Sequence, residues 1–422
     1  MFNGYPIVFS DTGGFLEQAL MPDIGWDKPW VYGPFLTPFH LRQTLWPAIF
    51  AQAMIVSALL WLTLCRVLAT PVDRRRLHLG VCAVLAVLTA APWFASTLMP
   101  DIFASLTVLG LFLLTAPLGP ATILLVAAIT TLSIAAHLAH LVLAAACLVV
   151  LSLLTRRVLW RQALPLGAAL ALISATNFAG GGTPAISPYG SVFAVARLIA
   201  NGPGRDVIQQ QCPAIGWRVC AWKDRLPADS DDFLWDPHGP VWADGFGPVR
   251  YAPEASTIVK ATLRAQPLAV LRTALDNTIT QLGLVRIGDT LGPDHLEVAV
   301  RPRLSLYFPP AEVARFDASR QARGQLAAFA ARFNALDLLV LVIGGVSTVV
   351  LVATQWRHNR PLANLAVLAL AALLANAAAT GALSHPHHRY QARIAWLVVL
   401  VPALAVAASL QRRAGDRGSR KP

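Results

Sequence analysis

The chain has 422 residues, of which 56% are hydrophobic and only 13% are charged, with a formal net charge of +12. Soluble domains carry about a quarter of charged residues, so this composition excludes an ordinary soluble domain. Mean hydropathy is +0.56, and long apolar runs alternate with short charged loops. That alternation is typical of a polytopic membrane protein.

The predicted fold is all-α: a polytopic bundle of about nine transmembrane helices with a large, mainly helical external loop domain. Several apolar runs are shorter than the ~20 residues that a helix needs to cross the hydrocarbon core. The turn formers Pro117-Leu118-Gly119-Pro120 favour a tight turn between the third and fourth runs. The nine predicted spans are Leu45–Leu68, Leu79–Leu98, Ile102–Ala116, Ala121–His137, Leu141–Leu154, Ala163–Phe178, Leu338–Thr354, Leu362–Leu383 and Ile394–Leu410.

Basic residues predict the orientation of these spans. They fall in alternate loops and in the C-terminal tail, accompanied there by only Asp73 and Asp416, so the whole net charge lies on one side. By the positive-inside rule that side is cytoplasmic. The pI of 10.2 therefore reflects topology, and we expect no nucleic-acid partner. The residues concerned are Arg66, Arg74, Arg75, Arg76, Arg156, Arg157, Arg161, Arg357, Arg360, Arg412, Arg413, Arg417, Arg420 and Lys421.

The spans divide the chain into five predicted regions. An external N-terminal loop precedes a transmembrane core of six spans, and an external soluble domain separates this core from three C-terminal spans and a basic cytoplasmic tail. An external N-terminus requires either translocation of a 44-residue tail or a preceding span that this chain lacks, and we favour the second explanation. The regions are 1–44, 45–179, 180–336, 337–411 and 412–422.

Two aspartates are predicted at the external face. Ser10 and Asp11 stand where a short helix could begin, so either could be its N-cap, with the carboxylate kept ionised at the helix N-terminus. Asp101 follows Pro100 at the start of the third span, and it is either an N-cap or a functional carboxylate. Acidic groups near a membrane face are costly unless they are wet, paired or functional.

Other external polar residues follow in order along the chain. His137 and His140 lie at the next outer turn, where their spacing would place them on one helix face, as polar trim or as substrate contacts. Cys212 and Cys220 could close a short disulfide loop in an oxidising compartment.

The region 180–336 is predicted to be mainly helical and to act as a lid or an acceptor platform, because a loop this long is rarely an idle connection. Its last helix is amphipathic and is expected on the membrane surface. The expected helices are Val192–Ala200, Ala255–Arg264, Leu268–Leu284 and Ala311–Phe333. The strand signal is confined to Glu297–Val300 and Leu304–Phe308.

The final external loop, Ser384–Arg393, is the densest polar cluster near the membrane. Arginine binds phosphate oxygens bidentately, so the loop could hold a phosphate. It could instead anchor lipid headgroups, or its histidines could bind zinc or copper, although no carboxylate or cysteine stands beside them. The cluster consists of His385, His387, His388, Arg389, Tyr390 and Arg393.

These features resemble the GT-C superfamily of integral membrane glycosyltransferases, which have an acidic first external loop, a second acidic site and a large external loop. Their late spans often begin with a segment that His388-Arg389-Tyr390 resembles. The resemblance covers residues 4–180 and 337–410, and that superfamily has a helix before its first external loop that this chain lacks. It implies transfer of a sugar from a polyprenyl-phosphate donor to a glycan, lipid or protein acceptor on the periplasmic side of a bacterial inner (plasma) membrane. Asp11 then matches the catalytic carboxylate and Asp101 the second acidic position.

The chemistry of that reaction assigns a role to each candidate. Asp11 would deprotonate the acceptor hydroxyl, and Arg389 or Arg393 would stabilise the departing phosphate. Asp101 could orient the acceptor or, with Asp11, hold a divalent cation such as Mg²⁺ or Mn²⁺. Further substrate contacts are expected from His137, His140, His388 and Tyr390.

Three other functions fit parts of the same pattern. A transporter would carry charges at the bilayer midplane, but the predicted spans have no Lys, Asp or Glu near their centres. A non-catalytic membrane scaffold would use the external domain to bind a partner. An O-antigen ligase or polymerase would also combine a large external loop with Arg and His residues.

Overall fold

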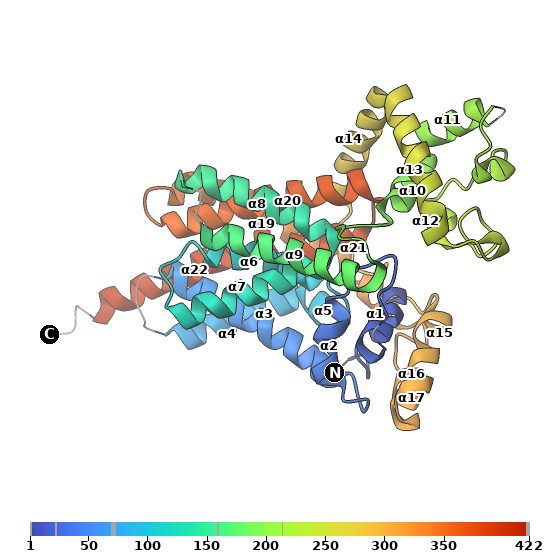
Figure 1. Ribbon diagram of the computed structural model, residues 1–422. Coiled ribbons are helices and arrows are strands. Elements are labelled where there is room, and N and C mark those ends of the chain that lie inside the picture. Colours follow the sequence, from blue (N-terminus) through green and yellow to red (C-terminus); the bar gives the residue numbers. More distant parts are fainter. Residues whose placement is uncertain (1, 22, 69–72, 158–159, 213, 419–422) are drawn as a thin grey trace.

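The computed structural model describes residues 2–21, 23–68, 73–157, 160–212 and 214–418 (Figure 1). All regular structure in these ranges is helical, apart from a single parallel bridge between Ile7 and Thr97. The prediction of an all-α protein is therefore confirmed for the described residues.

Six helical segments among the described residues are long and apolar enough to cross a membrane, which indicates an integral membrane protein. They correspond to six of the nine predicted spans. The last is formed by two helices, which meet at Trp396. The segments are α3 (Trp46–Val67), α8 (Leu138–Thr155), α9 (Trp160–Gly181), α19 (Asn334–Gln355), α20 (Arg360–Leu383), and α21 (His388–Ala395) joined to α22 (Leu397–Gly418).

The other three predicted spans form shorter helices. Leu79–Leu98 was predicted as one span, but it is split between α4 (Arg74–Leu88) and α5 (Ala91–Ala95) by the extended residue Thr89. The Thr89 hydroxyl accepts a hydrogen bond from the Ala91 amide, which fixes this corner.

The central helix of the bundle is α6 (Ile102–Leu113), and all twelve of its residues are buried. At about 1.5 Å per residue it is too short to cross a bilayer, and its neighbours separate it from lipid. The expected turn at residues 117–120 separates α6 from α7 (Pro120–Ala135), so these are two helices as predicted.

The bundle has two chemically different ends. One end, called the site end here, carries α1 (Ser10–Leu20) and the start of α21. The last helix, α22, runs to the opposite end, called the tail end (Figure 1). At the tail end Asn359, in the turn before α20, donates to the Val67 carbonyl oxygen at the end of α3. Arg66, Arg74, Arg75, Arg76, Arg357 and Arg360 therefore lie around that end. Arg420 and Lys421, together with the side chain of Arg417, fall outside the described residues.

The region between α9 and α19 forms two lobes at the site end. The first lobe has a core of its own, which includes Val195, Phe233 and Tyr251. It contains α10 (Gly190–Ala200), α11 (Pro203–Gln211), η1 (Arg218–Trp222), α12 (Ser230–Trp235), η2 (Ala243–Gly245) and α13 (Pro248–Ala265). A disulfide joins Cys212 to Cys220 in this lobe, with the two Cα atoms 5.4 Å apart.

The second lobe shares the core of the bundle and holds the N-terminal segment in place. Tyr5 donates to the buried Glu312 carboxylate at 3.0 Å, and Gln321 donates to the Val8 carbonyl oxygen at 2.6 Å. The lobe consists of α15 (Leu296–Ala299), α16 (Arg301–Tyr307), α17 (Pro310–Asp317) and α18 (Leu326–Ala331), and α14 (Pro267–Gly283) links it to the first lobe.

Two predictions for this second lobe were wrong. The expected strands Glu297–Val300 and Leu304–Phe308 are the helices α15 and α16. The expected single helix Ala311–Phe333 is broken between α17 and α18, where Gly324 adopts a positive φ of 71°. Contacts of Arg320 and Gln321 with the N-terminal segment outweigh the amphipathic pattern, because the Arg320 amide donates to the Asn3 carbonyl oxygen instead of continuing a helix.

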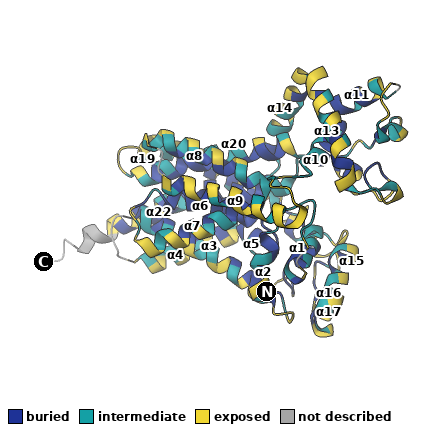
Figure 2. Cartoon of the chain, viewed as in Figure 1, coloured by how far each residue is buried: buried dark blue, intermediate teal, exposed yellow. Residues whose placement is uncertain are grey.

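Figure 2 shows buried residues concentrated along the middle of the bundle and exposed residues along its outer helices. Gly110 of α6 lies against Thr130 of α7 so closely that a Cβ atom there would overlap the Thr130 side chain. By contrast, nothing lies within 4 Å of a Cβ atom placed at Gly167 of α9. The contact between α6 and α7 therefore requires a glycine.

We expect Gly110→Ala to destabilise the protein by about 1–3 kcal/mol, the usual cost of overpacking a core. The measurement is the thermal unfolding midpoint in detergent. Gly167→Ala is the matched control, since it adds the same methyl group where there is space. Equal midpoints for the two variants would contradict the packing of α6 described above.

Candidate functional site

The carboxylate of Asp11 lies between two cations at the site end. Its helix, α1, has Phe9 as N-cap, so the expectation that Ser10 or Asp11 caps the helix was wrong. Asp11 sits in the first turn instead, 3.2 Å from the Lys28 ammonium and 3.5 Å from the Arg389 guanidinium. Its side chain keeps 31% exposure, so part of the carboxylate faces open space.

Arg389 lies in the first turn of α21 and bridges the two predicted carboxylates. Its Nη1 is 3.5 Å from Asp11 and its Nε is 4.0 Å from Asp101. The guanidinium also stacks over Phe9 at 4.6 Å and over Tyr390 at 5.0 Å, as in cation–π contacts. These rings fix the plane of the guanidinium, whereas the contacts to the carboxylates are long for charge-assisted hydrogen bonds.

Asp101 is the N-cap residue of α6, but its side chain makes no capping hydrogen bond. Its carboxylate instead accepts from Arg393 Nη1 at 3.0 Å, and both side chains are buried. Arg393 also donates to Asn376 Oδ1 at 3.4 Å. The Asn376 amide donates in turn to the Tyr390 carbonyl oxygen at 2.7 Å, so this one residue of α20 organises the start of α21.

Lys28 is a site residue that sequence reasoning missed. It bridges Asp11 and Asp27, at 3.2 and 2.9 Å, and lies over the Phe15 ring. Burial acts to raise the pKa of Asp11, but Lys28 and Arg389 outweigh it and lower that pKa to about 2. Asp11 is therefore fully ionised at neutral pH, and it is a weak base as long as both cations stay in contact with it.

His137 and His140 lie beside this cluster, with ring centroids 5.2 Å apart. His137 caps α8, its Nδ1 accepting from the Ala139 amide, so the neutral ring carries its proton on Nε2. Burial and the nearby Arg393 and Arg389 lower the pKa of His137 to about 3. His140 is buried with Nδ1 2.7 Å from the Ser133 carbonyl oxygen. Both histidines thus lie near the two arginines, and their predicted role as substrate contacts stays a prediction.

The histidines of the final external loop contact two different parts of the chain, the first lobe and the segment after α14. His387 Nε2 lies 3.7 Å from Asp231 and His385 Nε2 lies 4.0 Å from Asp229, both at the start of the first lobe's α12. His388 turns away from Arg389, since its Nδ1 accepts from the Arg286 amide at 3.1 Å. The structure therefore brings Asp11, Asp101, Arg389, Tyr390 and Arg393 together, but it does not bring His388 into this cluster.

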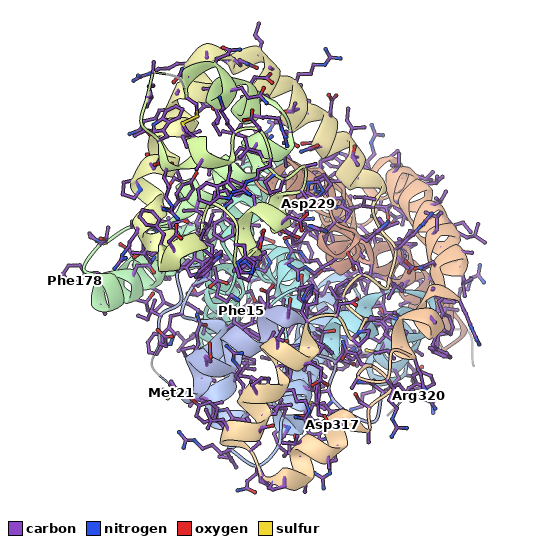
Figure 3. The ribbon with its side chains drawn as sticks, turned by 90° about the vertical axis from the view of Figure 1, so that its right-hand side faces the viewer. Phe15, Met21, Phe178, Asp229, Asp317 and Arg320 are labelled. Atoms are coloured by element: carbon purple, nitrogen blue, oxygen red, sulfur yellow. A yellow bond between two sulfur atoms is a disulfide. The ribbon has the colours of Figure 1, made fainter. Side chains whose placement is uncertain are left out.

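The first lobe is tied to the site both by packing and by charge. Trp26, two residues before Lys28, packs among the lobe's aromatic residues Phe193, Trp235 and Trp242. Asp231 lies near enough to Asp11 and Arg389 for their charges to act on it, and burial together with Asp229 raises its pKa. Figure 3 views the site end directly, with Asp229 of the first lobe above Phe15 of α1.

The missed residues carried no sequence signal of their own. Asp229 and Asp231 lie among several aspartates whose spacing distinguishes neither of them, and Asn376 lies within a predicted span where an amide is unremarkable. Asp289 accepts from the Arg389 backbone amide at 2.8 Å, although the two are separated by 100 residues. Only the tertiary fold could reveal these contacts.

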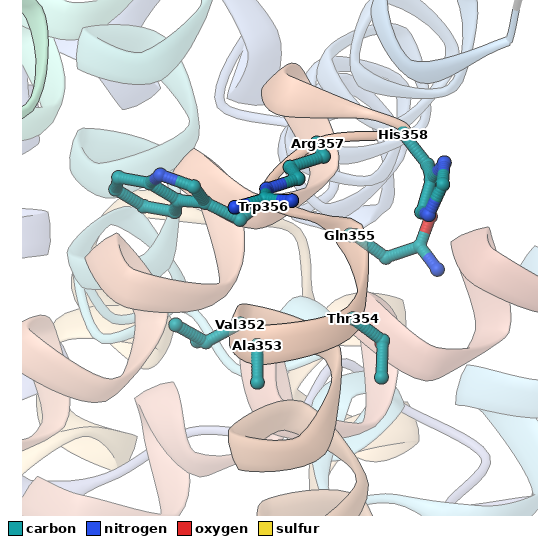
Figure 4. Close-up of a pocket in the computed structure, with 7 residues that line it drawn as sticks. All are labelled: Val352, Ala353, Thr354, Gln355, Trp356, Arg357 and His358. Carbon is teal, nitrogen blue, oxygen red and sulfur yellow. The ribbon is translucent and has the colours of Figure 1, made fainter.

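The charged cluster does not lie in the larger of the two hollows described here. A small cavity of about 70 Å³ lies beside it, lined by residues 24–29, Leu138, Asn177 and seven residues between 180 and 189. A larger and more open hollow, lined by Val352–His358, lies at the far end of α19 (Figure 4). That hollow contains none of the predicted site residues. The site is therefore identified by the charged side chains that meet there from distant parts of the chain, and not by the size of a cavity.

Within the described residues no group of three or more His, Cys, Asp or Glu side chains has the arrangement of a metal site. A cation held by Asp11 and Asp101 would have to compete with Lys28, Arg389 and Arg393 for the same oxygens.

Comparisons with protein-family models, with curated proteins and with solved structures each gave no match. The likeness to GT-C glycosyltransferases therefore remains an interpretation of the sequence motifs alone.

Removing Arg393 should be far more costly than removing an exposed arginine. Arg393→Gln leaves the buried Asp101 carboxylate without its partner, and such a change costs about 3–5 kcal/mol. The control is Arg272→Gln, which breaks the exposed pair with Asp276 at 3.9 Å and should cost under about 1 kcal/mol. Denaturation of both variants in detergent checks the difference, and similar losses would contradict the buried pair.

The neutral state of His137 predicts an acid dependence of stability. An unfolded histidine takes up a proton near its ordinary pKa of 6.5, whereas the folded chain resists protonation down to about pH 3. Unfolding therefore takes up a proton in this window, and stability falls as the pH drops from 6.5 towards 3. His137→Asn preserves an N-cap side chain and should make the unfolding midpoint less sensitive to acid between pH 6.5 and 4.5. An unchanged acid dependence would contradict this assignment.

Proposed function

We propose that this protein is a membrane glycosyltransferase that moves a sugar from a polyprenyl-phosphate donor to an acceptor hydroxyl. The observation that carries the proposal is the position of Arg389, whose guanidinium contacts Asp11 and Asp101, residues 378 and 288 positions away. A cation between two carboxylates, at one end of a bundle of apolar helices, supplies the parts needed to bind a lipid-linked phosphate and to move a proton.

The reaction proposed for this site balances as follows. Asp11 accepts the proton of the acceptor hydroxyl, the acceptor oxygen bonds to the anomeric carbon of the sugar, and the bond from that carbon to the phosphate oxygen breaks. Polyprenyl phosphate leaves with the bonding electron pair. Arg389 stabilises the negative charge that develops on the departing phosphate, in the way that fixed cations assist phosphate leaving groups.

The low pKa of Asp11 gives the donor a second role in this scheme. With a pKa of about 2, Asp11 would be a poor base at neutral pH. A donor phosphate that draws Arg389 away from its 3.5 Å contact removes one of the two cations that hold the pKa down. The pKa of Asp11 then rises only when the donor is bound, so Asp11 becomes an effective base only in the complex with the donor.

Arg393 and Asp101 have a supporting role in the proposal. The buried pair places the Asp101 carboxylate within 4.0 Å of Arg389 Nε, so the guanidinium keeps a partner when it leaves Asp11. If a divalent cation such as Mg²⁺ or Mn²⁺ takes part, it would bind the Asp11 and Asp101 oxygens in competition with the arginines.

The proposed orientation places the site end outside the cytoplasm. The basic residues of the turns between spans support a cytoplasmic tail end, with the C-terminus on that side. In a bacterial inner membrane the lobes and Asp11 would then face the periplasm, where the acceptor, a glycan, a lipid or a protein, would be met.

Asp11→Asn should lower the rate of transfer by roughly 10²–10⁴-fold, the usual contribution of a general base, because the amide cannot accept the proton. The assay uses purified protein in vesicles with a panel of radiolabelled undecaprenyl-phosphate hexoses and pentoses, and it measures the release of undecaprenyl phosphate on adding periplasmic extract as the acceptor source.

Asp27→Asn is the matched control. Asp27 contacts the same lysine at 2.9 Å but does not contact Arg389 in the structure, so its loss should leave most of the rate. Binding of the donor is followed separately, and Asp11→Asn should retain it. Wild-type turnover in Asp11→Asn would overturn the proposed role and favour a non-catalytic scaffold.

A further inference from the structure

The helix α14 carries an apolar stripe that no part of the described chain covers. Leu268, Leu271, Leu275 and Ile279 are all exposed, from 55% to 79%. Their spacing of three and four residues places them along one side of the helix. The charged residues Arg272 and Asp276 lie beside the stripe and form an exposed pair. This is the pattern of a helix that lies at a boundary between apolar and polar surroundings.

The opposite side of α14 is fixed to the bundle. Val270 and Gln281 are buried on this side. A Cβ atom at Gly381 would lie 2.7 Å from the Asn277 carbonyl oxygen, so the backbones of α14 and α20 meet there in close contact. Gln281 exchanges two hydrogen bonds with the backbone of His387, at 2.8 and 3.0 Å. The stripe is therefore held in a fixed position relative to α20.

The position of that contact identifies what the stripe faces. α20 is long and apolar enough to span a membrane, and Gly381 lies in its last turn at the site end. The exposed Leu374 stands seven residues earlier, almost two turns away, and so on the same face of α20 as Gly381. α14 thus covers the end of a face that α20 otherwise turns outward to lipid.

The direction of α14 supports the same conclusion. Figure 1 shows it leaving the end of α20 at a steep angle to the roughly parallel helices of the bundle, and reaching sideways beyond them towards the first lobe. A helix in that position lies across the site ends of the spans, at the level where we expect the spans to leave the membrane.

We propose that α14 lies in the membrane leaflet at the site end, with Leu268, Leu271, Leu275 and Ile279 among phospholipid acyl chains. Arg272 and Asp276 then mark the border with the headgroups. This placement does not depend on the enzymatic activity proposed above, since it concerns only how the first lobe is seated on the bilayer.

Nitroxide labels test this placement directly. Leu275→Cys and Ile279→Cys are labelled in protein whose free Cys65, Cys82 and Cys147 are replaced by alanine, with the Cys212–Cys220 disulfide left intact. The protein is reconstituted in vesicles of phosphatidylcholine and phosphatidylglycerol. Power-saturation spectra should show several-fold greater accessibility to oxygen, which concentrates in acyl chains, than to a water-soluble nickel chelate.

Asp276→Cys is the matched control, because it adjoins Leu275 but lies outside the stripe, and its label should favour the nickel chelate. A nickel preference at Leu275 and Ile279 equal to that at Asp276 would overturn the proposal by showing a water-exposed stripe. Low accessibility to both reagents, with dipolar broadening between labels, would also overturn it and would assign the stripe to a second copy of the chain. All labelled residues are exposed, so the labels leave the fold intact.

Discussion

The contact of Arg389 with both Asp11 and Asp101 is the interaction on which the arrangement of the site end depends. Three elements that are distant in sequence, α1, the start of α6 and α21, meet at this guanidinium. Charges withdrawn from water are costly unless each has a partner, so the two aspartates and the two arginines, Arg389 and Arg393, require one another. The remaining contacts serve this cluster: Asn376 holds the backbone of α21, and Lys28 balances the charge that Arg389 leaves on Asp11.

The helices of the bundle differ in length according to what surrounds them. α6 begins at Asp101 and is enclosed by other helices, so its length does not have to match the thickness of a bilayer. Helices that do face lipid, such as α19, keep the full length and expose aliphatic residues along one side, among them Val342, Val346 and Val349. Polar chemistry at one end and apolar contact along the sides thus place different demands on neighbouring helices.

The sequence predicted the fold class, six of the nine spans and most of the members of the charged cluster. Hydropathy and the positions of charged residues are local properties, so they can be interpreted without knowledge of the tertiary structure. Two of the failures have one cause, which is that long-range contacts override local patterns. The N-terminal segment breaks the helix expected at Ala311–Phe333, and the Arg286 amide draws His388 away from the site. Lys28 and Asp231 could not be foreseen, because a lone charged residue in a loop has no pattern to distinguish it.

Trp26 has a consequence for how the first lobe is related to the rest of the chain. Its ring lies inside the lobe's aromatic cluster, yet its backbone continues within two residues to the lysine that holds Asp11. The lobe is thus not a separable cassette that could be exchanged between proteins by cutting only at residues 182 and 266. A transplanted lobe would lack Trp26, which belongs to its aromatic cluster. In the remaining bundle Trp26 would be exposed, and Lys28 would hold Asp11 less firmly. Any natural relative with a different lobe should therefore differ at this position of the N-terminal loop as well.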